Sequence, residues 1–301
     1  MAESQHTTII NLFNSGIPPD VIALQLDISQ EEVDRVIANA ETSRIPEEPP
    51  TLASFYLDAV VDLDKAIKRA QERVWKALKV ESRFDLSTEE TYEVLAKLAK
   101  TKVKMVILHI DLVGSTRMSS TLPVDRLAAI VQAFMQEMSV TITAYGGFVL
   151  KYVGDAILAF FLARDDMYLP AVNAVNCARS LIKIVREGIN PILNQYDYPE
   201  INVRVGIDLG ENVVVQFGVD TFKVDGKKLA RPHYDIIGYT INITTKMTAL
   251  GKPDQIVIGQ MVYDLLDERQ RSTFHPLKVS PEVWSYMSDY SGGIYQVYGT
   301  A

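Results

Sequence analysis

The segment 146–161, GGFVLKYVGDAILAFF, restricts the fold more than any other stretch, because two apolar runs flank one Gly-Asp pair. The runs FVLKYV and AILAFF predict two antiparallel strands, and glycine and aspartate favour the tight turn between them. The turn holds Asp155, and a buried carboxylate is costly unless a partner offsets its charge. This window leaves three explanations open: Asp155 is an ordinary turn residue, it pairs with Lys151 across the hairpin, or it binds a cation.

The rest of the chain from Val103 mixes strand and helix patterns, and hairpins dominate over simple strand–helix–strand alternation. The predicted class is therefore α+β with a largely antiparallel sheet. A lysine-rich segment, 222–234, is predicted as a polar insert. The predicted strands are 103–112, 148–153, 156–161, 201–209, 212–218, 255–259 and 293–299, and the predicted helices are 124–146, 167–187, 240–250 and 260–267.

The first third of the chain is predicted to be entirely helical. Residues 1–44 form a helix-turn-helix-like module of short helices, in which Ser29 is a candidate N-terminal cap. The proline-rich residues 45–50 form a linker. Residues 51–102 form a helical connector that is a candidate for dimerisation, and residues 103–301 form the main domain.

The charge of the N-terminal module argues against DNA as a partner. The formal net charge of the chain is −8, and residues 1–50 hold nine acidic and two basic residues. A DNA-binding surface needs cations that face the phosphates. We therefore expect this module to contact a protein partner or a second copy of the chain.

Cysteine usage and hydropathy indicate a cytoplasmic protein without a membrane partner. The single cysteine, Cys177, lies in a helical pattern and predicts a buried, unreactive thiol in a reducing compartment. We expect no apolar run long enough to cross a bilayer, and the N-terminal residues do not resemble a signal sequence.

Two aspartates are candidates for binding metal. Asp111 ends the first predicted strand, in HIDLVGST, and Asp155 occupies the hairpin turn. If these strands are neighbours, the carboxylates converge at one edge of the sheet and need cations between them. Mg²⁺ prefers such oxygen ligands and completes its shell with water and phosphates. The next turn, Val113, Gly114, Ser115 and Thr116, offers backbone N–H groups to a polyphosphate. Taken alone, Asp111 is equally explained as a helix cap.

Four stretches in this order resemble the catalytic domain of the class III nucleotide cyclases: HIDLVGST, GGFVLKYVGDAILAFF, VRVGIDLGENVVVQFG and YDIIGYTINITTKM. The resemblance covers about residues 101–300. It implies a ferredoxin-like, mostly antiparallel sheet with flanking helices, and it identifies 103–301 as a nucleotide cyclase catalytic domain.

The resemblance also implies roles for individual residues. Two Mg²⁺ or Mn²⁺ ions would lie at Asp111, Leu112 and Asp155. Lys151 and Asp235 would read the base in the adenine-selecting version, because a lysine donates and a carboxylate accepts a hydrogen bond. Asn242 would orient the ribose, and Lys246 would stabilise the transition state. In isolation, Asp235 and Asn242 are also explained by local turn and helix contacts.

Three positions depart from the family pattern. Lys246 stands where arginine is usual, and lysine lacks the planar fork that holds two phosphate oxygens. Glu211 stands where many relatives carry a basic residue near the triphosphate, and the C-terminal end lacks a frequent lysine. The insert 222–234 either supplies replacement cations from Lys223, Lys227, Lys228 or Arg231, or forms a solvated arm at a dimer interface.

The implied function is an adenylate cyclase that forms 3′,5′-cyclic AMP and pyrophosphate from ATP by two-metal-ion catalysis. Because one domain carries both the metal-binding and the base-reading residues, we expect a homodimer with shared sites. The alternatives are a cyclase for a pyrimidine nucleotide or GTP, and a degenerate nucleotide-binding regulatory domain. A transcription regulator is a third, disfavoured by the acidic N-terminal module.

Overall fold

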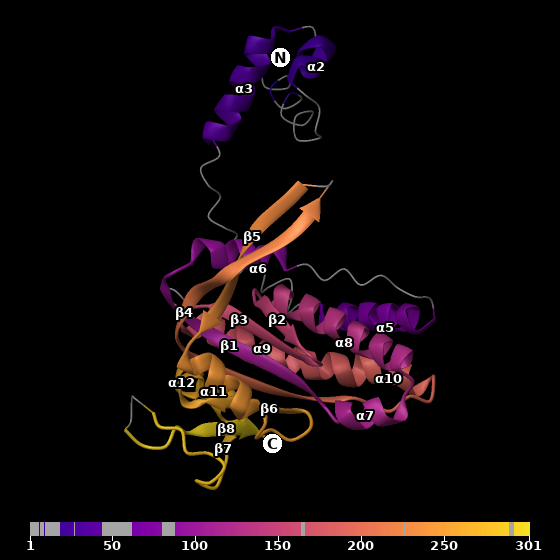
Figure 1. Ribbon diagram of the computed structural model, residues 1–301, viewed down its shortest axis with the longest axis vertical. Coiled ribbons are helices and arrows are strands. Elements are labelled where there is room, and N and C mark those ends of the chain that lie inside the picture. The colour runs from indigo at the N-terminus through magenta and orange to yellow at the C-terminus, as the bar shows by residue number, and fades with distance from the viewer. Residues whose placement is uncertain are drawn as a thin grey trace. The chain divides into compact units, whose positions relative to one another are not determined.

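The computed structural model describes residues 6, 9, 19–26, 28–43, 62–79, 88–163, 166–224, 227–288 and 292–301. The chain divides into two compact units, Met1–Ser54 and Phe55–Ala301 (Figure 1). The predicted linker 45–50 and the first part of the predicted connector lie outside the described residues.

The N-terminal unit is helical, as predicted. Its helices α2 (Pro19–Leu26) and α3 (Gln30–Ser43) enclose a small core that includes Ile9, Ile22 and Val33. Ser29 Oγ accepts a hydrogen bond from the backbone N of Glu32 at 3.3 Å, which confirms the predicted cap. The first of the predicted helices lies mostly outside the described residues.

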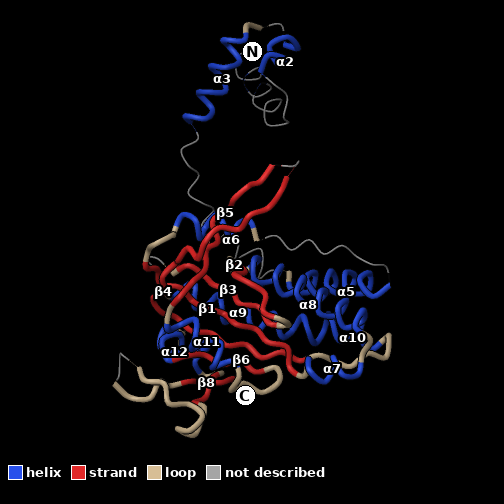
Figure 2. The backbone as a smooth tube through the Cα atoms, viewed as in Figure 1, coloured by secondary structure: helices blue, strands red, loops and turns tan. Residues whose placement is uncertain are grey.

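The second unit is built on an eight-stranded sheet (Figure 2). The strand order is β2-β3-β1-β4-β6-β8-β7, with β5 paired to β4. Of these pairs, β4–β6 is parallel and the others are antiparallel. The order β2-β3-β1-β4, with a helix after β1 and another after β3, is the ferredoxin-like arrangement that we predicted. The strands are β1 (Lys102–Val113), β2 (Phe148–Val153), β3 (Ala156–Leu162), β4 (Asn202–Val224), β5 (Lys227–Ile237), β6 (Gln255–Gly259), β7 (Phe274–Pro276) and β8 (Val297–Thr300).

Alternate residues of β1 enter two different cores. Val106, Leu108 and Ile110 pack in the large core with α8 (Val124–Ala144) and α9 (Tyr168–Lys183). Met105 and Ile107 pack in a smaller core with α6 (Glu89–Lys97). The period of two places these sets on opposite faces, so the sheet is covered on both sides and β1 is continuously apolar and buried from Met105 to Leu108.

Helix α8 corrects one prediction. Among the described residues it is the helix that is long and apolar enough to cross a bilayer, with a mean hydropathy of 1.2, whereas we expected no such run. Half of that window is buried inside the protein. Phe134, Met138 and Ile142 of α8 lie in the large core, so its hydropathy is explained by packing against the sheet.

Helix α5 (Leu63–Lys79) joins the main domain through its apolar stripe, Ile67, Ala70 and Val74. The carboxylate of Glu137, a buried residue of α8, accepts hydrogen bonds from Nε and Nη2 of Arg73 at 2.5 Å each. The part of the predicted connector that is described is therefore fixed to α8 by both apolar packing and an ion pair.

Other departures from the predicted elements concern strand continuity. The predicted strands 201–209 and 212–218 are one strand, β4, because Glu211 and Asn212 pair with β1 instead of forming a turn. The predicted insert 222–234 continues β4 and pairs as β5, so it is an antiparallel arm (Figure 1). The helix after β3 continues through a π-helical turn, Ile184–Ile189, into α10 (Asn190–Asn194).

The helices around the last strands are short. Helix α11 (Tyr239–Thr248) packs on β4 where two glycines allow a close approach. A Cβ at Gly206 would lie 2.2 Å from Thr248 Oγ1, and one at Gly210 would lie 2.1 Å from Thr240 Oγ1. The remaining helices are α7 (Ser115–Thr121), α12 (Gln260–Leu265) and α13 (Glu268–Arg271).

Candidate functional site

The two candidate metal-binding aspartates leave neighbouring strands at the same end of the sheet. Ile110 of β1 is paired with Ile157 of β3. Asp111 is the next residue of β1, two residues before the strand ends, and Asp155 lies two residues before Ile157 in the turn that Gly154, with φ 63°, makes possible. The two residues therefore lie at the same end of neighbouring strands, and the convergence of their carboxylates stays a prediction.

The surroundings of Asp155 fit a cation. Its Oδ2 atom is buried and, among the described residues, has no hydrogen-bond partner. A buried carboxylate oxygen without a donor is costly unless a positive ligand satisfies it. Magnesium and manganese take such oxygen ligands. No group of three or more His, Cys, Asp or Glu side chains gathers in the described part of the chain, so an ion here would take its other ligands from backbone, water or substrate oxygens.

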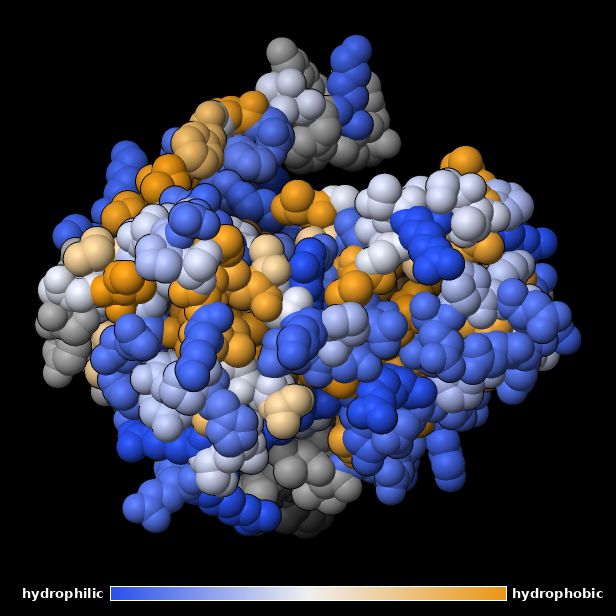
Figure 3. Space-filling model, turned by 90° about the horizontal axis from the view of Figure 1, so that it is seen from below, coloured by the Kyte–Doolittle hydropathy of each residue, from blue (hydrophilic) through white to orange (hydrophobic). Residues whose placement is uncertain are grey.

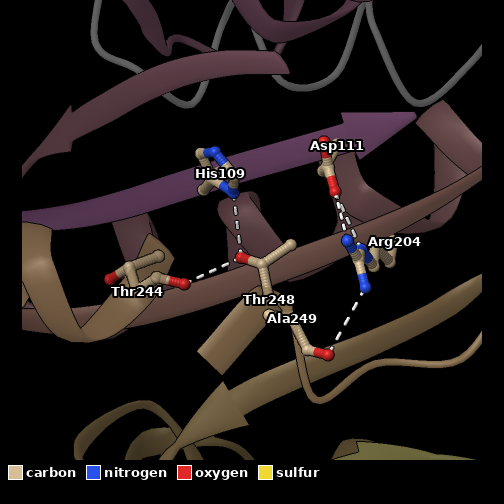
Figure 4. Close-up of polar contacts among 6 residues, drawn as sticks. All are labelled: His109, Asp111, Arg204, Thr244, Thr248 and Ala249. Atoms are coloured by element: carbon tan, nitrogen blue, oxygen red, sulfur yellow. Dashed lines mark hydrogen bonds and ion pairs between the residues drawn. The ribbon is translucent and has the colours of Figure 1, made fainter. Parts of the chain in front are cut away.

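Asp111 has a partner that sequence analysis missed. Arg204, directly opposite on β4, donates from Nε and Nη2 to Asp111 Oδ2 at 2.8 and 2.7 Å (Figure 4). Its Nη1 also donates to the carbonyl of Ala249, which caps the end of α11, at 3.4 Å. Arg204 therefore connects the carboxylate to α11, and pairing VRVGI with HIDL in antiparallel register would have revealed it.

His109 is a packed histidine. Its Nδ1 lies 3.0 Å from Thr248 Oγ1, and that hydroxyl donates to the carbonyl of Thr244 at 2.7 Å (Figure 4). Because the hydroxyl hydrogen is already used, Nδ1 must carry the proton that His109 donates. Burial lowers the pKa of His109, which favours this neutral form.

The candidate base-reading residues meet each other. Lys151 Nζ of β2 contacts Asp235 Oδ2 of β5 at 2.5 Å. Asp235 Oδ1 accepts from the backbone N of Ile236 at 2.8 Å, which fixes the carboxylate. Among the described residues, Lys151 thus forms its ion pair with Asp235, 84 residues away, and not with Asp155 across the hairpin. A donor and an acceptor stand side by side and remain partly open to solvent.

Asn242 and Lys246 lie one turn apart on the exposed side of α11. The Lys246 Nζ lies 5.3 Å from the centre of the Tyr286 ring. On the opposite side, Ile243 and Met247 enter a core with Trp284 and Tyr295. The helix thus presents its polar pair outward from a fixed apolar base.

The predicted phosphate turn follows β1 directly. Val113 is the last residue of β1, and Gly114, with φ 82°, precedes Ser115 at the start of α7. A left-handed conformation of this kind favours glycine. Leu112 is buried, so its backbone is the part available at this edge. Thr116 is exposed.

Glu211 and Arg231 each have a partner of opposite charge. Glu211 pairs with Lys102 at 3.0 Å. Arg231 of the arm pairs with Glu89 of α6 at 2.9 Å and lies over the Tyr92 ring. Arg231 therefore fastens the arm to α6, and Lys223 is exposed on the arm. The side chains of Lys227 and Lys228 lie outside the described residues.

Asp208 is a buried carboxyl that sequence analysis did not single out. Its Oδ1 accepts from Tyr295 Oη at 2.7 Å and from the backbone N of Leu209 at 2.9 Å. Burial nevertheless raises the pKa of Asp208 to about 7. Asp208 lies among packed residues of β4, α12 and the C-terminal segment, and we assign it a structural role.

Asp208→Asn is expected to flatten the pH dependence of stability. Because burial raises the pKa of Asp208 from 3.8 to about 7, the folded protein keeps a proton that the unfolded chain loses in this range. The free energy of unfolding therefore falls as pH rises from 4 to 7, and asparagine removes this contribution. Urea unfolding followed by tryptophan fluorescence checks this, since Trp75 and Trp284 both lie in Phe55–Ala301. An equal slope of the free energy of unfolding against pH in the wild-type protein and in Asp208→Asn would contradict this prediction.

Comparisons with known proteins indicate one family. Residues 97–281 match the sequence model of the family described as the adenylate and guanylate cyclase catalytic domain. Two cytidylate cyclases of Escherichia coli are 25% and 27% identical over 54% and 59% of this chain. These matches span 35% and 39% of those two proteins, so the chain corresponds to well under half of each.

The fold has solved counterparts. The adenylyl cyclase CyaB of P. aeruginosa is 21% identical, with a TM-score of 0.52, over 67% of this chain and 95% of that one. This similarity concerns the fold. It agrees with the ferredoxin-like order of the first four strands and with the covering helices.

Proposed function

The chain belongs to the family of adenylate and guanylate cyclase catalytic domains, and from this we propose that it is an adenylate cyclase. It would convert ATP into 3′,5′-cyclic AMP and pyrophosphate. The observation that carries the choice of base is the contact between Lys151 and Asp235 at 2.5 Å.

This pair matches bases that carry an exocyclic amine. Lys151 can donate to a ring nitrogen, and Asp235 can accept from the amine beside it. Adenine offers this pattern through its N6 amine, whereas guanine and uracil present a carbonyl oxygen at the corresponding position. A carbonyl placed against the Asp235 carboxylate would bring two acceptors together, so guanine and uracil are disfavoured.

Cytosine is the second candidate, because its N4 amine beside a ring nitrogen presents the same donor and acceptor order. The cytidylate cyclases named above favour it as well. The Lys151–Asp235 pair therefore selects amino bases over keto bases, and the size of the base must decide between ATP and CTP.

The chain's own residues would hold the substrate as follows. Asp111 and Asp155, with the backbone at Leu112, would hold two divalent ions, and the turn 113–116 would face the phosphates. When bound, these ions would lower the pKa of the ribose 3′-hydroxyl and balance the charge of the triphosphate. Asn242 would orient the ribose, and Lys246 would place a positive charge beside the phosphate from which pyrophosphate departs.

A product assay with four nucleotides tests this function. We expect cyclic AMP as the main product from ATP with Mg²⁺ or Mn²⁺, a smaller yield from CTP, and the lowest yields from GTP and UTP. Asp235→Asn should reduce the preference for ATP over GTP by about 10-fold or more, because an amide can also donate to a carbonyl. A main product from GTP would contradict the base assignment. Tight nucleotide binding without any cyclic product would favour a degenerate regulatory domain.

Mixing two inactive variants tests the shared site. If one subunit supplies Asp111 and the other supplies Asn242, a heterodimer of Asp111→Ala and Asn242→Ala contains one complete site. We expect the mixture to recover a substantial part of the wild-type activity, while each variant alone stays inactive. Differently tagged subunits, purified as heterodimers, provide the measurement. No recovery in confirmed heterodimers would place all site residues in one chain.

A further inference from the structure

Lys246 has an aromatic neighbour that the family pattern does not explain. Its ammonium Nζ lies 5.3 Å from the centre of the Tyr286 ring, within the range in which a ring face attracts a cation. Lys246 itself is exposed on α11, and Tyr286 is half-buried in the segment that precedes β8. The contact therefore joins an exposed side chain to a ring that the fold holds.

The Tyr286 ring is fixed by its surroundings. It packs edge-on against Trp284, with ring centres 4.9 Å apart at 69°. Trp284 is buried, and its Nε1 donates to the carbonyl of Tyr295 at 2.7 Å. The backbone N of Tyr295 donates in turn to the carbonyl of Tyr286 at 2.7 Å. Ring and backbone at position 286 are thus both anchored to the core.

The same segment is joined to the start of α11. Tyr239 Oη donates to the carbonyl of Met287 at 2.9 Å. On the buried side of the helix, Ile243 and Met247 share a core with Trp284. The Tyr286 ring is therefore held near α11, within reach of the Lys246 side chain.

We propose that Tyr286 is a positioning residue that holds the Lys246 ammonium against its ring face. A lysine has a long flexible stem and a compact charge, so it loses more freedom than the arginine fork when it is placed. A fixed ring face restricts the ammonium before substrate arrives, which offsets part of that disadvantage. This inference rests on the proposed function, in which Lys246 contacts the phosphates.

Spectroscopy tests the contact without using activity. Reductive methylation with ¹³C-formaldehyde keeps the lysine charge and gives each dimethylammonium an NMR signal. We expect the signal that disappears in Lys246→Arg to be shifted by the ring current, to stay shifted in Tyr286→Phe, and to move to the ordinary position in Tyr286→Leu. Lys79, whose Nζ lies 4.5 Å above the Trp75 ring, is the internal control and should keep its shift in these variants. An unshifted Lys246 signal in the wild-type protein would overturn the contact.

Kinetics tests the positioning role. An exposed ring–cation contact predicts that Tyr286→Leu lowers kcat by about two- to five-fold, and that Tyr286→Phe restores most of the loss. The Tyr286→Leu change should have no further effect when Lys246→Met is already present, because the ring then has no cation to hold. Trp75→Leu, which removes the contact between a ring and Lys79, is the matched control and should leave kcat unchanged.

Several outcomes would overturn the proposal. An equal loss in the Lys246→Met background would show that Tyr286 acts only through the fold, and a rise in kcat would show that the ring restrains Lys246 away from the substrate. If Tyr286→Leu does not fold by circular dichroism, Tyr286→Met repeats the test. A wild-type protein with a shifted Lys246 signal but no cyclic product would instead contradict the proposed function.

Discussion

Asp155→Asn should abolish cyclic nucleotide formation while leaving the fold intact. Asparagine keeps the size of the side chain but removes the charge that a divalent ion requires. Changing groups that only orient metal ligands already lowers metal affinity or activity by about 10- to 100-fold. Losing a ligand should therefore lower kcat by roughly 100-fold or more. The buried Oδ2, which has no donor among the described residues, is the structural reason to select Asp155. The rate of product formation at saturating Mn²⁺ provides the measurement.

The control makes the same chemical change where no metal is expected. Asp197 is exposed and has φ 56°, a conformation that asparagine also tolerates, so Asp197→Asn should retain full activity. Titration of Mn²⁺ by electron paramagnetic resonance gives a second measurement, in which Asp155→Asn should bind weakly. Unchanged activity and unchanged Mn²⁺ binding in Asp155→Asn would contradict a metal site at this turn.

Arg73→Met is expected to give the largest loss of stability. Glu137 is 3% exposed, and the substitution leaves its carboxylate buried without the two contacts at 2.5 Å. Removing one member of a buried ion pair typically costs about 3–5 kcal/mol. Since Arg73 is itself 39% exposed, we expect a value near the lower end, about 3 kcal/mol. Urea unfolding followed by tryptophan fluorescence measures the change.

The double variant Arg73→Met/Glu137→Met separates the pair from the packing around it. Replacing a whole buried ion pair with apolar side chains is often neutral, so most of the stability should return. Lys65→Met, at an exposed ion pair with Asp62, serves as the matched single variant and should cost about 0–1 kcal/mol. A double variant as unstable as Arg73→Met would contradict the assigned role of the buried charge.

The sequence was sufficient for features that depend on local pattern. The hairpin around Gly154-Asp155 follows from two apolar runs and a turn pair, and the ferredoxin-like order follows from the resemblance to the family. The N-terminal cap at Ser29 is also local, because it involves residues three apart. Both kinds of prediction were confirmed.

Features that depend on contacts far apart in the sequence were not accessible. Lys151 had two candidate partners, and only the folded sheet brings Asp235, 84 residues away, to its side. Arg204 was not identified from the sequence, because its contact with Asp111 depends on the register between β1 and β4. The continuity of β4 was missed for a related reason. Glu211 and Asn212 are residue types that favour turns, yet in the structure both pair with β1 as part of one strand.

The ion pair between Lys151 and Asp235 has a consequence for affinity. If this pair reads the base as proposed, an incoming base competes with an internal contact, because each charged group exchanges its neighbour for the nucleotide. For a partly exposed pair the penalty is about 0–1 kcal/mol, which a base that complements both charges repays at once. In the proposed site, a base that satisfies only one of them would leave the other charge without its neighbour, so the resting contact would add up to about 1 kcal/mol to the discrimination against mismatched nucleotides.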